Sequence, residues 1–224
     1  MAAMRRTIRF YFDFISPYAY LAWTKMPGIA ARFEDDLAPV PVLFAGLLDA
    51  HGTKGPAEVP ARRRYLIKDV ARKAATLGVE IDAPHAHPFN PLLLLRIASL
   101  PVGDEERARL IDRFYRAVWV ERRDIMSLSV VREILREGGH DPHLVEQASL
   151  PESKERVRSQ TVEAIQLGVF GVPTAVVEGE MFWGTDSLGD LYRYLEGKDP
   201  IAKDLVERWE SLPAAAIRPG SQRA

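Results

Sequence analysis

This chain carries strand patterns only near its two ends, and a long helical stretch separates them. Residues 61–168 show helical patterns interrupted by proline- and glycine-containing breaks, and no strand is expected among them. Short runs with strand character lie on either side, at 7–14, 39–44, 174–178 and 181–183. A chain of this pattern is expected to form an α/β protein, in which one small sheet is built from both ends of the sequence.

The first strand leads directly into a helix. The run 7–14 mixes β-branched and aromatic residues and stops at Ser16 and Pro17, where serine suits the N-cap and proline the first helical position. The helix is expected over 18–33, with a kink or break at Pro27-Gly28. Polar, glycine-bearing residues at 46–55 are expected to form a connection rather than an element.

The end of the chain is expected to form a hairpin and a closing helix. Gly179 separates the last two strands, and residues 187–195 have helical character. The resulting order is β-α-β, a helical insert, then β-β-α, which is the order of a thioredoxin fold carrying a large all-helical insertion. The expected domains are a thioredoxin-like domain at 5–45 and 169–212, an inserted helical domain at 46–168, and a loose tail at 213–224.

Composition excludes several classes of function. The 224 residues include no cysteine, which removes disulfides, thiolate metal sites and any cysteine nucleophile or redox dithiol. Thirty basic and 31 acidic residues give a net charge of −1, so neither nucleic acid nor a membrane is an expected partner. The histidine pairs His85/His87 and His140/His143 lack an obvious carboxylate partner set, and no metal is expected. With no signal-like leader, a cytoplasmic location is expected.

Three separate segments place polar groups where they can bind a ligand. Ser16 sets a hydroxyl at the N-terminus of a helix, where free N–H groups and the helix dipole favour an anion such as a thiolate. The simpler interpretation is that Ser16 only caps the helix.

The other two segments lie near the C-terminal strands. Val172 and Pro173 precede a strand, and a cis bond between them would expose backbone groups to an extended ligand such as glutathione; an ordinary loop is the alternative. Thr185, Asp186 and Ser187 follow the last strand at the start of the closing helix. Asp186 and Ser187 either cap that helix or bind the α-amino and α-carboxylate groups of a γ-glutamyl moiety.

Together, three motifs resemble a known family. The segments FDFISPYAY at 12–20, GVFGVPT at 168–174 and FWGTDSL at 182–188 are similar to those of the 2-hydroxychromene-2-carboxylate isomerases, relatives of kappa-class glutathione transferases and DsbA-like proteins. The resemblance spans residues 8–196. It implies that Ser16 takes the position of the redox cysteine of DsbA-like enzymes and holds the thiolate of glutathione by hydrogen bonding, without itself attacking.

The resemblance also suggests further contacts. Glutathione is expected to meet Thr53 and Arg62, where relatives often carry asparagine and lysine, and Ser187, where arginine is common. The full expected cofactor set is Ser16, Thr53, Arg62, Val172, Pro173, Thr185, Asp186 and Ser187. The expected substrate contacts are Pro17, Tyr18, Asn90 and Trp119. Two of these have structural alternatives, since Asn90 fits a helix-starting turn and Trp119 fits the core.

The activity implied by the resemblance is glutathione-dependent cis–trans isomerisation of 2-hydroxychromene-2-carboxylate or a related aromatic-degradation intermediate. The implied partner is a small aromatic organic acid, and a homodimer is expected by analogy. Two alternatives remain open. One is a kappa-type transferase that conjugates an electrophile to glutathione, and the other is a non-catalytic glutathione- or peptide-binding module.

Overall fold

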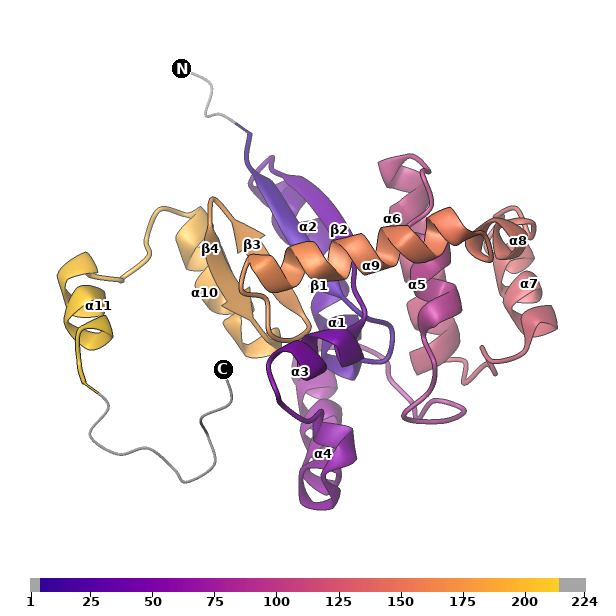
Figure 1. Ribbon diagram of the computed structural model, residues 1–224, viewed down its shortest axis with the longest axis horizontal. Coiled ribbons are helices and arrows are strands. Elements are labelled where there is room, and N and C mark those ends of the chain that lie inside the picture. The colour runs from indigo at the N-terminus through magenta and orange to yellow at the C-terminus, as the bar shows by residue number, and fades with distance from the viewer. Residues whose placement is uncertain (1–4, 214–224) are drawn as a thin grey trace.

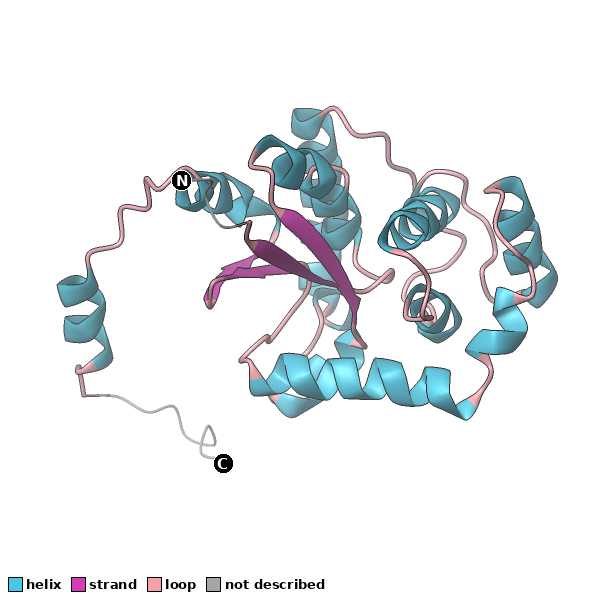
Figure 2. Ribbon diagram, turned by 90° about the horizontal axis from the view of Figure 1, so that it is seen from above, coloured by secondary structure: helices cyan, strands magenta, loops and turns pink. Residues whose placement is uncertain are grey.

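A four-stranded mixed sheet lies between helices on its two faces (Figures 1 and 2). The computed structural model describes residues 5–213. The strand order is β2-β1-β3-β4, in which β1 and β2 are parallel and the other neighbours are antiparallel. The strands are β1 (Thr7–Phe12), β2 (Asp36–Pro41), β3 (Thr174–Val177) and β4 (Glu180–Trp183). The sheet therefore joins the two ends of the chain, as the sequence predicts.

Helices make up the rest of the regular secondary structure in the described chain. The first two are α1 (Pro17–Trp23) and α2 (Met26–Arg32), and α3 (Phe44–Ala50) spans the start of the insert. The insert continues with the 3-10 turn η1 (Pro56–Glu58), α4 (Pro60–Leu77), α5 (Leu92–Ala98), α6 (Asp104–Trp119), α7 (Leu128–Glu137), α8 (Leu144–Ala148) and α9 (Pro151–Gln166). After the sheet come η2 (Thr185–Ser187), α10 (Leu188–Leu195) and α11 (Lys203–Glu210). Figure 1 shows α5 to α8 gathered at one end of the molecule and α9 returning across the sheet.

Alternation along β1 divides the core between the two faces of the sheet. Ile8, Phe10 and Phe12 are buried on one face, where they join a large cluster that includes Trp23 of α1 and residues of α5 and α6. Tyr11 points to the other face and joins a smaller cluster beneath α3 and α9. Because the larger cluster unites strand and insert residues, the predicted domain boundaries stay a prediction.

The main features of the predicted order are confirmed. The break in the first long helix occurs, with Pro27 inside the first turn of α2. Residues 61–168 contain no strand. The hairpin turns at Glu178 and Gly179, whose φ angles are 52° and 91°. Successive positive φ values are typical of the tight turns that join antiparallel strands.

Three local assignments differ from prediction. The second strand occupies 36–41 rather than 39–44, and its prolines are tolerated because β2 lies at an edge of the sheet. Residues 44–50, predicted as strand end and polar connection, form α3. Helix α11 lies within a segment for which no helix was predicted, and none of its residues is buried. Most of the predicted loose tail, 214–224, lies outside the described residues. Among residues 5–213, no helix combines the length and apolar character needed to cross a bilayer.

Candidate active site

Ser16 caps α1 and faces the turn that precedes β3. Its Oγ accepts a hydrogen bond from the Ala19 N–H at 3.2 Å and donates one to the Val172 carbonyl at 3.5 Å. Pro17 occupies the first turn of the helix, as predicted. Helix α1 has only seven residues, so its dipole contributes at the weak end of the usual range. The Ser16 hydroxyl is therefore expected to stabilise a bound anion more than the dipole of α1 does.

A buried carboxylate supports the loop that carries Ser16. Asp13 is fully buried, and its two oxygens accept the N–H groups of Ile15 at 3.0 Å and Phe44 at 2.9 Å. Burial raises the pKa of Asp13 to about 7, although these backbone hydrogen bonds act in the opposite direction. The Asp13 carbonyl accepts the Ser16 N–H at 3.1 Å. Asp13 thus ties the loop after β1 to the start of α3.

Two side chains from the insert hold the same loop. The Trp119 indole N–H donates to the Phe14 carbonyl at 3.0 Å, and His87 Nε2 lies 3.1 Å from the Ile15 carbonyl. Burial lowers the pKa of His87. The insert therefore positions the backbone of the two residues that precede Ser16.

The turn before β3 presents backbone groups beside Ser16. The Val172–Pro173 bond is cis, as the sequence suggests. The Pro173 carbonyl accepts the Gly184 N–H at 2.9 Å, whereas the Val172 N–H makes no hydrogen bond to any described residue. This N–H is available to pair with the backbone of an extended ligand.

On the other side of α1, a polar cluster joins α1, α4 and η2. The Tyr18 hydroxyl donates to Asp69 at 2.8 Å, and Lys73 Nζ lies 2.9 Å from the same carboxylate and 3.2 Å from Asp186. Burial and the hydrogen bond to Asp69 raise the pKa of Tyr18. Burial opposes ionisation of Asp69, but hydrogen bonds from Lys73 and Tyr18 produce a net lowering of its pKa. Asp186 is thereby connected to the residues around Tyr18.

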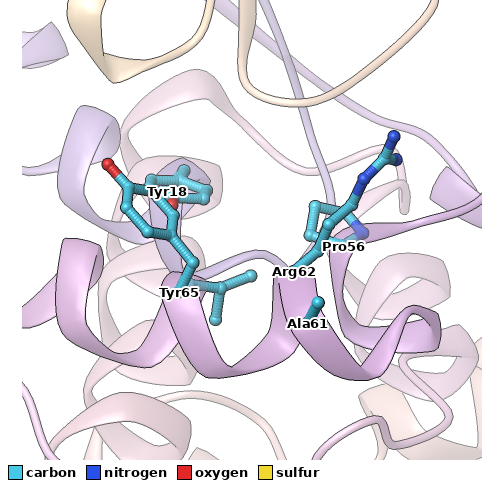
Figure 3. Close-up of a pocket in the computed structure, with 6 residues that line it drawn as sticks. Tyr18, Pro56, Ala61, Arg62 and Tyr65 are labelled. Atoms are coloured by element: carbon cyan, nitrogen blue, oxygen red, sulfur yellow. The ribbon is translucent and has the colours of Figure 1, made fainter.

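An open pocket of about 420 Å³ lies between α1, η1 and α4. Figure 3 shows Tyr18 and Tyr65 on one side of it and Pro56 and Arg62 on the other. The lining residues are Tyr18, Pro56, Ala61, Arg62, Tyr65 and Leu66. Arg62 is exposed and makes no ion pair with any residue between 5 and 213. The pocket combines apolar walls with one guanidinium, which suits an aromatic carboxylate.

Other predicted residues have structural partners. Thr185 is buried, and its hydroxyl donates to the Tyr18 carbonyl at 3.1 Å, while the Ser187 hydroxyl donates to the Gly184 carbonyl. Thr53 is exposed in the loop after α3. Asn90 accepts the Leu92 N–H at 3.0 Å, which is the turn that the sequence offered as an alternative. Their roles in binding stay predictions.

Trp119 lies in the core, as its alternative interpretation holds. The side chain is buried, and its ring lies 5.7 Å from that of His87, measured between centroids. It supports the Ser16 loop through its hydrogen bond to the Phe14 carbonyl, and it is not among the residues that line the pocket.

The sequence interpretation missed Asp13, Tyr65, Asp69 and Lys73. The last three are spaced four residues apart along one predicted helix, so they lie on the same face of it. That spacing was available as a signal. The contacts of these residues with Tyr18 and Asp186 could not be predicted from the sequence, because they depend on how α4 packs against α1.

Comparison with known proteins finds relatives that align with most of this chain. The family model for the DSBA-like thioredoxin domain matches residues 7–196. The 2-hydroxychromene-2-carboxylate isomerase of Sphingobium xenophagum is 30% identical over 195 residues, covering 86% of this chain and 99% of that protein. Glutathione S-transferase kappa 1 of Rattus norvegicus is 24% identical over 213 residues, covering 88% of this chain and 94% of that one.

A solved structure of a related protein has the same fold as this chain. A structure of 2-hydroxychromene-2-carboxylate isomerase superposes with a TM-score of 0.78 at 25% identity, covering 93% of this chain and all of that chain. The predicted thioredoxin fold with a helical insertion is confirmed. The chain therefore belongs to the DSBA-like thioredoxin-domain family, and within it the chain is related to proteins named 2-hydroxychromene-2-carboxylate isomerase.

Proposed function

We propose that this protein is a glutathione-dependent cis–trans isomerase acting on 2-hydroxychromene-2-carboxylate or a related aromatic acid. The observation that carries the proposal is the position of the Ser16 hydroxyl, 3.5 Å from the Val172 carbonyl, at the position where the family resemblance puts the thiol of glutathione. The similarity to named isomerases supports the choice of reaction class.

Ser16 is suited to hold a thiolate. Its oxygen already accepts the Ala19 N–H, while its proton is shared with a carbonyl at the outer limit of hydrogen-bonding distance. Little is lost when that proton turns to a sulfur anion instead. A hydrogen bond to the charged form lowers the pKa of a thiol, whose ordinary value is about 8.5.

The other residues would hold the rest of the cofactor. The Val172 N–H, which makes no hydrogen bond to any described residue, would pair with the peptide backbone of glutathione, and the exposed Asp186 would bind its α-amino group. When bound, glutathione supplies a thiolate that adds reversibly to a conjugated double bond, so that rotation can occur before elimination restores the bond. Val172 is hydrogen-bonded to Ser16, and Thr185, which precedes Asp186, is hydrogen-bonded to Tyr18 of the helix that Ser16 caps, so the residues present fit the cofactor.

The pocket beside Tyr18 would receive the substrate. The rings of Tyr18 and Tyr65 offer an aromatic surface, and Arg62 is free to bind a carboxylate. The Tyr18 hydroxyl is held by Asp69, and its raised pKa keeps it protonated across the physiological range. Tyr18 therefore acts as a neutral wall rather than as a base.

Turnover of 2-hydroxychromene-2-carboxylate with reduced glutathione tests the proposal. Ser16→Ala should reduce kcat at least about tenfold, since it removes a hydrogen bond to a charged group. Ser129→Ala, at an exposed serine of α7, is the matched control and should leave turnover unchanged. Equal turnover by wild type and Ser16→Ala would contradict the role of Ser16. Glutathione binding without turnover of any aromatic acid would instead favour the non-catalytic module.

The kappa-type transferase remains a second candidate because a kappa-class enzyme aligns with 88% of this chain. The two reactions differ in whether glutathione is consumed. Stoichiometric loss of free thiol with an electrophile, and no isomerisation, would select the transferase.

A further inference from the structure

Lys73 stands between two carboxylates at the edge of the candidate site. Its Nζ lies 3.0 and 2.9 Å from the two oxygens of Asp69, and 3.2 Å from Asp186 Oδ1. The Lys73 side chain is 24% exposed and that of Asp69 14%, whereas that of Asp186 is 82% exposed. The lysine is therefore held from the protein side by Asp69, and its contact with Asp186 faces solvent.

The two contacts of Lys73 differ in strength. Asp69 holds the ammonium with both oxygens and is itself fixed by the Tyr18 hydroxyl. The Asp186 contact uses one oxygen of an exposed side chain, and exposed ion pairs contribute little. Asp186 can turn to another cation at small cost, while Lys73 stays in place.

The charges of this cluster suit a ligand that bears both signs. Lys73 contributes one positive charge, and Asp69 and Asp186 contribute two negative charges. An ammonium group that binds Asp186 balances the excess negative charge and leaves one side of Lys73 free for an anion. A cation and an anion a few ångströms apart are what the α-ammonium and α-carboxylate of an amino acid require.

We propose that Lys73 selects for the α-carboxylate of the thiol cofactor, beside the α-ammonium group that the proposed function assigns to Asp186. The inference rests on the proposed function, in which both groups belong to the γ-glutamyl end of glutathione. It adds to that function a specificity residue on α4, outside the three motifs that carry the family resemblance.

Calorimetric titration with two ligands tests the role of Lys73. The first ligand is reduced glutathione, and the second is 4-aminobutyryl-cysteinyl-glycine, which lacks only the α-carboxylate. Lys73→Gln should raise the Kd for glutathione about tenfold and leave the Kd for the second ligand unchanged, because one charged hydrogen bond is removed. Lys68→Gln, at an exposed lysine of the same helix, is the matched control and should bind both ligands like wild type.

A complementary experiment with Asp186→Asn keeps the proposal testable if Lys73→Gln does not fold. Asp186→Asn alters an exposed side chain, and glutaryl-cysteinyl-glycine lacks only the α-amino group. This variant should weaken glutathione binding and leave binding of the glutaryl ligand unchanged. Equal weakening of the intact and truncated ligands by either variant, or no weakening at all, overturns the proposal. If wild type binds no glutathione, the proposed function falls as well, so the two failures are distinguishable.

Discussion

At Ser16, one hydroxyl serves both the fold and the candidate site. The oxygen caps α1 through Ala19, and the proton extends toward the Val172 carbonyl. Capping and ligand binding were alternatives in the sequence, yet the structure makes them compatible, because the two interactions use different parts of the hydroxyl.

The protonation of Asp13, in the same loop, makes the free energy of unfolding depend on pH. Because its pKa is raised from 3.8 to about 7, the folded state holds a proton that the unfolded chain releases. Its contribution to stability is therefore full below pH 4 and is lost as the pH rises to 7. We expect about 3 kcal/mol of the free energy of unfolding to disappear between pH 5 and 8.

Urea denaturation at these two pH values measures the effect of Asp13. Asp13→Asn has no carboxyl proton to lose, so this part of the pH dependence should vanish in the variant. A variant with the same loss of stability between pH 5 and 8 as wild type would show that Asp13 stays ionised in the folded protein.

Individual residues also mark where sequence interpretation reaches its limit. The capping role of Ser16 follows from local sequence, and the structure confirms it. The pairing of Lys73 with Asp186 joins residues more than a hundred positions apart, so no local pattern contains it. Asn90 shows the opposite case, because its contact with Leu92 is local and was one of the two interpretations.

At the scale of elements, tertiary contacts determine α3. Its first N–H groups are held by side chains from elsewhere, with Phe44 bonded to Asp13 and Leu43 bonded to Thr161 of α9. The residues themselves read as a strand end followed by a polar turn. This explains why α3 was missed, since its N-terminus is satisfied by partners that are distant in sequence.

Thr161 offers a direct test of that explanation. Thr161→Val removes the acceptor of the Leu43 N–H at 2.9 Å while nearly keeping the side-chain shape. A buried donor without a partner costs about 1–3 kcal/mol, so the free energy of unfolding should fall by this amount. Thr161→Ser keeps the hydroxyl and should cost clearly less. Chemical denaturation of both variants provides the comparison, and an equal or greater loss in Thr161→Ser would show that packing of the methyl group matters at least as much as the hydrogen bond.

At the scale of the whole molecule, α11 stands apart from the body (Figures 1 and 2). Trp209 of this helix is 69% exposed, whereas Trp23 in the main cluster is 1% exposed. Helices this short are marginal in water without packing. The helix also follows the end of the family match at residue 196.

Two tryptophan substitutions test this contrast. Trp209→Ala should change the free energy of unfolding by no more than about 0.5 kcal/mol, and Trp23→Ala should cost about 3–5 kcal/mol. Thermal or urea denaturation measures both. A large loss in Trp209→Ala would mean that α11 packs against an apolar surface in solution.

That the three motifs meet at one site could be predicted only from their combined order along the chain, and not from any one motif. Residues 12–20 are far in sequence from 168–174 and 182–188, and the order of the three segments around a helical insert indicated one fold. Their meeting depends on β1 pairing with β3 and β3 with β4. Sequence order thus predicted the topology, while the polar cluster built on α4 required the packed structure.

The central claim is that Ser16 holds the thiol of bound glutathione as its anion. The most direct measurement is the ultraviolet absorbance of the thiolate as a function of pH, with glutathione saturating the wild-type protein and Ser16→Ala. We expect the thiol bound to wild type to ionise below its ordinary pKa of about 8.5, and Ser16→Ala to move the transition back toward that value. Ionisation at the same pH in both proteins would contradict the claim.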